Sequence, residues 1–553
     1  MLHLNHIRTK IATPTNKLMK KASGRYYTGE PVGRRLAQVA ARALAASWQG
    51  QHEIHAVDPF GGDGRLLVWL VEAWVDLSMP QCAWRLELWD LDNADFIVAK
   101  AHIERLRNKG IDVTCEYIVA DAFQRAINST NTFDIVVTNP PWELLKPDRR
   151  ETECLQHDVR EAYVADMRRY DSWLAEHYPL SQPRRKFAGW GTNLSRVGLE
   201  LSVKLTGAGG TLGIVIPASL LADDQSFNIR KHLIADHRVL DIAYYSAEMK
   251  LYECADVASV ALVAETYRIA LQAIPIHSYT KSFAVGESTR VTLDFERLSK
   301  FDFSLPISFG AQAAKLISEL YEKFPTWGEL EADRENEFWA GREIDETGSS
   351  GWLAPIHECA IPFLKGRMID RYQVRDTPVF GVGKIGWNPP NSMKFERIAW
   401  RDVSRPNQKR RIIAALVPSG WALGNSLGVA HFFNAKSGGI RALLGVMNST
   451  VFELMLRSHL ATGHISLSAL RKVPVPNAEQ LEAAVQLQRY VEKAISGDME
   501  AELFADAYVA LKIYGLKLNE YLMVLDLFPK LGDDEKSDRR LAFERLNGGR
   551  CDE

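Results

Sequence analysis

Four consecutive residues, Asn139, Pro140, Pro141 and Trp142, combine the groups best suited to chemistry in this sequence. The carboxamide oxygen of Asn139 and the carbonyl oxygen of Pro140 are neighbouring hydrogen-bond acceptors, and Trp142 adds a flat aromatic face. The two acceptors can take both N–H bonds of a planar amino group while the indole stacks on the ring that carries it. The same residues would also suit a surface turn after a core strand, so the neighbouring elements decide between the two interpretations.

The elements around these residues predict that they lie at the edge of a sheet. Residues 133–137 have the pattern of a short buried strand, and the two prolines hold the chain extended as it leaves that strand. Asn139 is then placed at the carboxyl end of a strand, where open α/β sheets bind their ligands. A second Asn-Pro-Pro sequence, at residues 388–390, has no strand before it, and we predict a loop there.

A glycine-rich turn follows another predicted strand. Residues 54–58 form that strand, residues 59–64 the turn and residues 65–76 a helix. The glycines let the backbone approach a ligand closely, and the first N–H groups of the helix are available to it. No lysine follows as a phosphate-binding loop would need, but the turn alone does not separate nucleotide, dinucleotide and S-adenosylmethionine as ligands.

Two further predicted strands, at residues 84–89 and 115–120, also end in acidic residues. The first ends in Asp90-Leu91-Asp92, and an acidic residue at this position, Asp90 or Asp92, binds a ribose diol in Rossmann-like sheets. Asp121 follows the second, and with Phe123 beside it could bind an adenine amino group and cover its ring. Four strand ends that carry Asp58, Asp90, Asp121 and Asn139 therefore predict a nucleoside cofactor laid across the sheet.

The remaining pattern predicts that strands and helices continue to alternate after a polar, charged insertion at residues 146–195. We expect helices at residues 32–48, 94–107, 196–205 and 227–235, strands at 211–216, 239–245 and 258–264, and a turn at 207–210. Amphipathic helices are predicted at 479–495 and 499–528.

Composition indicates an ordinary intracellular protein of several domains. The 553 residues are too many for one core, and 46% hydrophobic and 25% charged residues are typical of globular chains. A net charge of -2 leaves any nucleic-acid binding to local basic clusters. The six scattered cysteines favour a reducing cytoplasm and predict no metal site. No apolar run reaches the roughly 20 residues of a membrane span, and no signal peptide is expected.

The order of these motifs resembles that of the N6-adenine DNA methyltransferases of restriction-modification systems, in the gamma-type arrangement. Gly24–Thr28 resembles their G-x-[FY]-[FY]-T-P motif, Asp58–Gly64 their D-P-A-C-G-S-G motif, and Asn139–Trp142 their catalytic [ND]-P-P-[YFW] motif. The chain departs from the pattern at Gly29, where the family usually has proline, and at Gly61, where it usually has cysteine.

The resemblance implies S-adenosylmethionine as cofactor and adenine as methyl acceptor. It places Tyr26, Tyr27, Thr28, Asp58, Gly62 and Gly64 around the methionine end, Asp90 on the ribose, and Asp121 and Phe123 at the adenine, with Phe60 and Ala122 completing the expected set. It implies Asn139, Pro140, Pro141 and Trp142 as catalytic residues, and Tyr252 is our candidate for a second aromatic that stacks on the flipped base.

The second half resembles the target-recognition domains of the same systems, in Leu364–Tyr372, Leu444–Ser449 and His464–Pro476. We expect Lys365, Arg367, Arg371, Arg401 and Arg410 to contact DNA, although any one of these side chains would also suit a solvated face. The domains expected are an N-terminal arm (1–23), a methyltransferase domain (24–300), a DNA target-recognition domain (301–478) and a C-terminal helical region (479–553).

The fold class expected is α/β, a Rossmann-like S-adenosylmethionine-dependent methyltransferase domain with a mixed sheet, plus an α+β recognition domain and a helical tail. The function implied is sequence-specific N6-methylation of a flipped-out adenine in double-stranded DNA, for a restriction-modification or phage-defence system with a restriction endonuclease or defence subunits as partners. Alternatives are methylation of an amino group in RNA or of a protein glutamine, and a DNA-binding subunit without activity. A fused nuclease is not expected, because only residues 1–23 precede the first motif.

Overall fold

The computed structural model describes residues 28–129, 132–147, 156–184, 186, 189–252, 257–268, 273–292, 298–299, 302–305, 307–345, 350–359, 361–375, 378–383, 387–404, 408–433, 439–460 and 464–548. The chain divides into two compact units, Met1–Lys315 and Leu316–Glu553. The division falls inside helix α12 (Ala311–Lys323), later than the predicted boundary at residue 300. The second unit contains residues 316–478 of the predicted recognition domain together with the predicted helical region.

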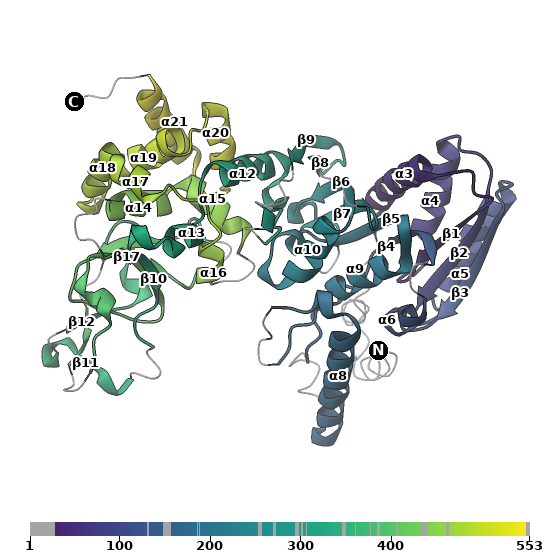
Figure 1. The fold of residues 1–553 in the computed structure, drawn as a ribbon, viewed down its shortest axis with the longest axis horizontal. Coiled ribbons are helices and arrows are strands. Elements are labelled where there is room, and N and C mark those ends of the chain that lie inside the picture. Colours follow the sequence, from purple (N-terminus) through teal and green to yellow (C-terminus); the bar gives the residue numbers. More distant parts are fainter. Residues whose placement is uncertain are drawn as a thin grey trace. The chain divides into compact units, whose positions relative to one another are not determined.

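Nine strands form one mixed sheet in the described part of the first unit (Figure 1). They are β1 (Glu53–Asp58), β2 (Ala83–Asp90), β3 (Val113–Val119), β4 (Phe133–Thr138), β5 (Thr206–Pro217), β6 (Arg238–Tyr245), β7 (Ser259–Glu265), β8 (Ala273–Tyr279) and β9 (Val285–Thr292). Their order is β3-β2-β1-β4-β5-β7-β6-β8-β9. Strands β1 to β5 run parallel, whereas β7 runs antiparallel between β5 and β6. The predicted Rossmann-like mixed sheet is confirmed.

Helices cover both faces of this sheet. One face packs against α3 (Glu30–Ser47), α4 (Arg65–Asp76) and α5 (Phe96–Asn108), and the other against α6 (Ala122–Arg125), α8 (His157–His177), α9 (Leu194–Leu205) and α10 (Phe227–Ala235). Alternation along β4 explains this arrangement, because Ile135 and Val137 face the first layer and Val136 faces the second. A strand buried on both faces reads as a continuous apolar run, which is why β4 was recognisable from sequence.

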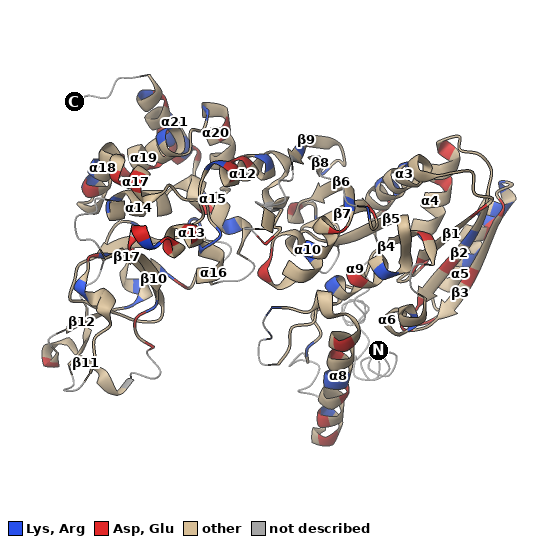
Figure 2. Cartoon of the chain, in the orientation of Figure 1, with Lys and Arg blue, Asp and Glu red and all other residues tan. Residues whose placement is uncertain are grey.

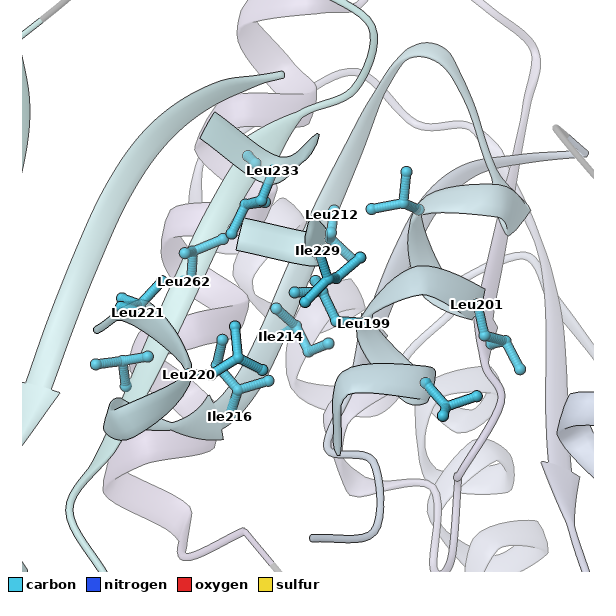
Figure 3. Packing of buried hydrophobic residues seen from close by; sticks show 14 of the residues in the cluster. Leu199, Leu201, Leu212, Ile214, Ile216, Leu220, Leu221, Ile229, Leu233 and Leu262 are labelled. Atoms are coloured by element: carbon cyan, nitrogen blue, oxygen red, sulfur yellow. The ribbon is translucent and has the colours of Figure 1, made fainter. Parts of the chain in front are cut away.

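The core under α9 and α10 holds the strands next to β4 in place (Figure 3). It joins Leu199 and Leu201 of α9, Leu212, Ile214 and Ile216 of β5, Ile229 and Leu233 of α10 and Leu262 of β7, all almost completely buried. Burying such side chains contributes roughly 1.5–3 kcal/mol each relative to exposure, so α9 is firmly docked on the sheet. Helix α9 can therefore serve as a rigid support for residues at the end of β4.

Most predicted elements of the first unit are confirmed within one or two residues, and α4 and α10 match residue for residue. The predicted turn at residues 207–210 is wrong, because β5 begins at Thr206 and runs through these glycines. Its pairing with β4 shifts register there, from Phe133 opposite Thr206 to Ile135 opposite Thr211. The glycines form an irregularity within a strand, with Gly209 at φ +74°. Helix α8 and strands β8 and β9 were not predicted.

The described part of the second unit contains two four-stranded sheets and a group of helices. One sheet has the order β10 (Phe338–Gly341), β17 (Leu427–Phe432), β14 (Arg397–Arg401), β15 (Ala414–Val417); the other has β11 (Leu353–Pro355), β13 (Phe380–Val382), β12 (Ile361–Leu364), β16 (Ala422–Leu423). The helices are α13 (Trp327–Ala332), α14 (Gly439–Met447), α15 (Thr450–Ser458), α16 (Leu467–Leu470), α17 (Ala478–Ala483), α18 (Val485–Ile495), α19 (Met499–Tyr508), α20 (Leu518–Asp526) and α21 (Asp533–Asn547). Helix α14 packs on both β15 and α18, which unites sheets and C-terminal helices.

Two sequence expectations in this unit are resolved by the structure. The predicted helix at residues 499–528 is broken, because α19 passes into a π-helical turn at Val509–Ile513 before α20 begins. Residues 388–390 are irregular, which confirms the predicted loop at the second Asn-Pro-Pro sequence.

Among the described residues no single helix has the length and apolar character of a membrane span. Only α14 and α15 taken together, bent by 64°, have that length and apolar character.

Candidate active site

The structure places the Asn-Pro-Pro-Trp residues at the carboxyl end of β4, between β1 and β5. Pro140 is buried against Gly198 of α9, where an added Cβ would lie 2.3 Å from the Pro140 Cβ. The chain beyond Trp142 is tied to the start of α9, because the N–H of its first residue, Leu194, donates to the Glu143 carbonyl at 2.9 Å. The close approach at Gly198 and this tie fix the path of the backbone through Asn139.

Trp142 and Tyr252 lie together beside this strand end. Their ring centroids are 4.6 Å apart and the rings are inclined at 68°, an edge-to-face contact. Tyr252 is buried, and its hydroxyl donates to Ser259 Oγ at 3.3 Å, at the start of β7. Burial raises the pKa of Tyr252 to about 12, so this hydroxyl is neutral at physiological pH. The structure thus brings the two aromatic candidates for base stacking into contact.

Asp58, at the end of β1, is linked directly to the catalytic strand. Its Oδ1 accepts a hydrogen bond from Thr138 Oγ1 at 2.6 Å and another from the Phe60 N–H at 3.1 Å. The carboxyl group is 1% exposed, and burial raises its pKa to about 7 against the opposing effect of these two hydrogen bonds. A buried carboxyl that is half ionised at neutral pH is well suited to a ligand that carries positive charge.

The glycine-rich turn docks on the end of β2. The Gly61 N–H donates to the Trp89 carbonyl at 2.9 Å, and the Gly62 N–H donates to Asp90 Oδ2 at 3.1 Å. Gly62 and Gly64 adopt φ of +50° and +73°, conformations that favour glycine. An added Cβ on Gly61 would lie 2.2 Å from Leu88 Cδ1. In this chain Leu88 fills the space next to the turn. This explains why residue 61 is glycine, although the family that the chain resembles usually has cysteine at this position.

Asp90 is the acidic residue of β2 that the structure connects to the turn. Its Oδ1 also accepts from the Asp92 N–H at 3.2 Å, and its side chain remains partly exposed. Asp92 is exposed and accepts from the Ala94 N–H at 2.9 Å instead. The geometry therefore favours Asp90 over Asp92 as the residue that faces a ligand at this strand end.

The end of β3 presents Asp121 and Phe123. Asp121 caps α6, because its Oδ1 accepts from the Phe123 N–H at 3.0 Å. The Phe123 ring packs on the ring of Phe60, from the glycine-rich turn, with centroids 5.3 Å apart. Ala122, which lies between Asp121 and Phe123 in the sequence, is buried, and Asp121 is only 4% exposed. Two predicted site residues, Phe60 after β1 and Phe123 after β3, thus lie in one aromatic cluster.

The N-terminal motif is described only in part. Tyr26 and Tyr27 lie outside the described residues. Thr28 is buried directly before α3, and its Oγ1 makes no hydrogen bond with the part of the chain that the structure describes.

The basic residues predicted to contact DNA fall into two groups. Arg367 is exposed and Lys365 partly so, with its Nζ 5.7 Å from the centroid of the Phe363 ring. Arg401 is partly exposed, and its Nε donates to the Ile369 carbonyl at 3.0 Å.

Arg410 and Arg371, in contrast, are turned into the second unit. Arg410 is buried, pairs with Glu453 and donates to the Asn448 carbonyl at 2.7 Å. Arg371 is 15% exposed, lies 3.3 Å from Glu502 and donates to the same carbonyl at 3.2 Å. The structure gives these two guanidinium groups partners within the unit where we expected DNA. The fully buried Glu453 in particular requires a cation.

The sequence did not single out Thr138, Gly198 and Tyr170, which all contact site residues. Thr138 directly precedes Asn139, and this adjacency was the available signal. Tyr170 donates a hydrogen bond to Asp121 Oδ2 at 2.9 Å from helix α8. Buried residues Tyr163, Met167, Tyr170 and Leu174 recur at helical spacing within the charged insertion, so that pattern was visible as well. Nothing local marked Gly198.

A cavity of about 600 Å³ lies elsewhere, among α3, α4 and α5. Its lining includes Arg34, Glu72 and Lys109, and both cations are paired with Glu72, at 3.1 Å and 2.9 Å. None of the predicted site residues that the structure describes lines this cavity. We therefore place the candidate active site at the strand ends and not in this cavity.

The chain is similar in structure to several solved restriction-modification proteins. The type IIG restriction endonuclease BpuSI matches with a TM-score of 0.45 and 14% identity, over 96% of this chain and 67% of that one. The type IIL restriction-modification enzyme MmeI, solved in complex with DNA, matches with a TM-score of 0.44 and 11% identity, over 99% and 77%. The methyltransferase subunit of a type I restriction-modification system from Streptococcus thermophilus matches with a TM-score of 0.34 and 16% identity, over 50% and 53%.

No protein-family model matches the sequence, and a comparison with curated proteins gives no match.

Proposed function

We propose that this protein is an S-adenosylmethionine-dependent methyltransferase that methylates N6 of adenine in DNA. The observation that carries the proposal is the spatial order of the strand ends. Strand order β3-β2-β1-β4 sets Asp121, Asp90, Asp58 and Asn139 side by side in that sequence. Neighbouring strands are spaced by about 4.8 Å, so the four ends span about 14 Å, the scale of an extended nucleoside with an amino-acid tail.

The donors at these strand ends fit the chemistry of the cofactor. Asp121 supplies an acceptor for the adenine amino group, and Phe60 and Phe123 supply an aromatic environment beside it. Asp90 supplies a partly exposed carboxylate for the ribose hydroxyls. Asp58 and the backbone of the glycine-rich turn suit the charged methionine end, which includes a cationic sulfonium. When bound, the cofactor supplies an electrophilic methyl group.

Asn139 and Pro140 would orient the acceptor. Asn139 Oδ1 and the Pro140 carbonyl can accept the two N–H bonds of an exocyclic amine, which directs the nitrogen lone pair out of the plane of the ring. No strong base is needed if the proton leaves after transfer. Catalysis then comes from positioning and from a site closed to water. The buried backing of Pro140 by Gly198 supplies the rigidity that such positioning requires.

A base inside a duplex cannot reach this site, so we propose that the target adenine is flipped out. Flipping costs a few kcal/mol, and stacking on an aromatic side chain returns about 1–3 kcal/mol per base. Trp142 and Tyr252 provide two adjacent rings at the strand end for this purpose. The second unit supplies exposed basic groups such as Arg367, and its motifs resemble target-recognition domains.

The motif resemblance supports a biological setting in a restriction-modification or phage-defence system. Double-stranded DNA is then the substrate, and a restriction endonuclease or other defence subunits are the partners we propose. A methyltransferase for RNA or for a protein glutamine would use the same Asn-Pro-Pro-Trp residues on a different planar amino group.

The test is transfer of labelled methyl from S-adenosylmethionine to unmethylated duplex DNA, with RNA and protein substrates in parallel. Hydrolysis of the DNA to nucleosides should give the label in N6-methyldeoxyadenosine. Mapping of the modified positions then yields the recognition sequence. Label in RNA or protein and none in DNA would retain the cofactor site and overturn the proposed substrate.

A further inference from the structure

Helix α8 lies in the segment between β4 and α9 that the sequence presents as a charged insertion. Acidic and basic residues are interspersed along the helix (Figure 2). One side of the helix is a buried stripe of Tyr163, Met167, Tyr170 and Leu174 that joins the core on the α9 face of the sheet. The helix is therefore anchored on the first unit at the end of the sheet that holds Asp121.

Two tyrosines at the C-terminal end of this helix bind the β3 strand end. Tyr170 donates its hydroxyl proton to Asp121 Oδ2 at 2.9 Å, and Tyr178 donates to the Phe123 carbonyl at 2.5 Å. With the Phe123 N–H on Oδ1, both oxygens of the Asp121 carboxylate receive a hydrogen bond. The carboxylate is thus held in one orientation by its own helix cap on one side and by α8 on the other.

The Tyr170 ring is itself held in place. It stacks on Trp173 with centroids 5.9 Å apart and an interplanar angle of 11°. Burial and the neighbouring Asp121 charge raise the pKa of Tyr170 well above its ordinary value, so the hydroxyl stays protonated and remains a donor. A fixed donor on one oxygen of a buried carboxylate restricts the orientation of that carboxylate.

We propose that Tyr170 is a positioning residue that holds the Asp121 carboxylate in one orientation toward the adenine amino group, and so sets the preference of the site for a 6-amino over a 6-oxo purine in the cofactor. This inference rests on the proposed function. A 6-amino group donates to the carboxylate, whereas a 6-oxo group meets it acceptor to acceptor. Sites built to pair with a polar group reject analogues that cannot complete the pair.

Removal of the Tyr170 hydroxyl should weaken this discrimination. Asp121 would lose one donor in a site where it is only 4% exposed, and its carboxylate would then reorient more easily. A 6-amino group depends on the orientation of the oxygen that accepts its N–H bond, whereas a 6-oxo group makes no hydrogen bond with that oxygen. Binding of the 6-oxo purine should therefore suffer less than binding of the 6-amino purine. A merely structural defect would weaken both ligands alike.

The test is calorimetric binding of S-adenosylhomocysteine and of its deaminated analogue S-inosylhomocysteine to the full chain. Tyr170→Phe should weaken binding of the first about tenfold, the size expected for one lost hydrogen bond to a charged group, and binding of the second by less than about twofold. Tyr245→Phe is the matched control, because that buried hydroxyl makes no hydrogen bond with the described residues. It should leave both affinities unchanged.

Asp121→Asn gives a second variant that retains an acceptor for Tyr170. Its side-chain amide can donate to a 6-oxo group, so the preference for S-adenosylhomocysteine should fall or reverse. Equal weakening of both ligands in Tyr170→Phe, with the wild-type preference intact, would overturn the inference and leave the proposed function standing. Failure of the wild-type protein to bind S-adenosylhomocysteine at all would instead overturn the proposed function.

Discussion

Thr138 Oγ1 donates a hydrogen bond to Asp58 Oδ1 at 2.6 Å, across the neighbouring ends of β4 and β1. Thr138 directly precedes Asn139, the residue that we propose orients the methyl acceptor. Asp58 is the carboxylate that we propose faces the methionine end of the cofactor. This hydrogen bond links the proposed cofactor-binding residues to the proposed acceptor-binding residues. A change in the ionisation of Asp58 would therefore affect both groups of residues.

Ionisation of Asp58 should make cofactor binding depend on pH. Because the pKa of Asp58 in the folded chain is about 7, above its ordinary value of 3.8, the folded protein holds a proton between these values that the unfolded chain has lost. The stability of the cofactor-free protein should therefore fall as pH rises through this window. A cationic ligand favours the ionised carboxylate, so affinity for S-adenosylmethionine should rise about tenfold from pH 6 to pH 8.

Asp58→Asn checks this directly by calorimetry at pH 6, 7 and 8. The variant should bind more weakly at pH 8 and lose the rise in affinity with pH. Asp134→Asn is the control, since Asp134 is an exposed carboxylate on the same β4 strand that accepts from the His55 N–H at 2.8 Å. A pH dependence that persists unchanged in Asp58→Asn would show that another group titrates.

Gly198→Ala should disturb the site through Pro140. Alanine favours helix by about 1 kcal/mol over glycine, but here its Cβ would lie 2.3 Å from the Pro140 Cβ. Displacement of the backbone at Asn139 should lower the transfer rate about 10- to 100-fold while S-adenosylhomocysteine affinity stays near that of the wild type.

The comparison variant is Gly213→Ala in β5, where an added Cβ would meet its neighbours at 3.4 Å or more. That variant should transfer methyl groups at close to the wild-type rate. Equal rates in both alanine variants would mean that α9 does not position Asn139.

Loss of the Trp142 ring should impair base stacking. With 2-aminopurine at the target position of the mapped recognition sequence, wild-type protein should increase the fluorescence as the base leaves the stack. Trp142→Ala should reduce that signal and weaken DNA binding at least about tenfold, whereas Trp142→Phe should retain most of both.

Tyr252→Phe keeps the second ring and removes only the hydroxyl that donates to Ser259, so it should cost less than about 1.5 kcal/mol in binding. An undiminished fluorescence signal in Trp142→Ala would assign the stacking to another residue.

Arg410 and Arg367 should differ in what their loss affects. Arg410→Ala leaves the fully buried Glu453 with fewer partners and should lower the free energy of unfolding by about 3 kcal/mol. Arg367 is exposed, so Arg367→Ala should leave stability within about 0.5 kcal/mol and reduce the salt dependence of DNA binding by about one phosphate contact. Denaturant unfolding and binding titrations at several salt concentrations measure the two effects. The reverse pattern would restore Arg410 to the DNA surface.

The elements of the first unit were largely predictable because their signals are local. The apolar run of β4, the glycines before α4 and the helical spacing in α10 each specify an element from its own residues. The insertion was predicted only as polar and charged, because the charged residues of α8 outnumber Tyr163, Met167, Tyr170 and Leu174, whose helical spacing was nevertheless visible in the sequence. The glycines after Thr206 suggested a turn, but pairing with β4 keeps them in a strand.

The contacts that define the site could not be predicted, since they join residues far apart in the sequence. Thr138 with Asp58, Tyr170 with Asp121 and Gly198 with Pro140 each depend on how strands and helices pack. The same holds for Arg371 and Arg410, whose charges suggested DNA. A basic side chain looks alike in sequence whether its partner is a phosphate or a buried glutamate.

The central claim is that Asn139 orients the amino group that receives the methyl. Single-turnover methyl transfer to DNA by Asn139→Ala, with S-adenosylhomocysteine binding measured on the same preparation, tests it most directly. We predict that the affinity of the variant for S-adenosylhomocysteine stays within about twofold of the wild type. The transfer rate should fall about 100- to 1,000-fold, the size of effect when one positioned hydrogen-bonding group of an active site is removed. Transfer at the wild-type rate by Asn139→Ala would contradict the account.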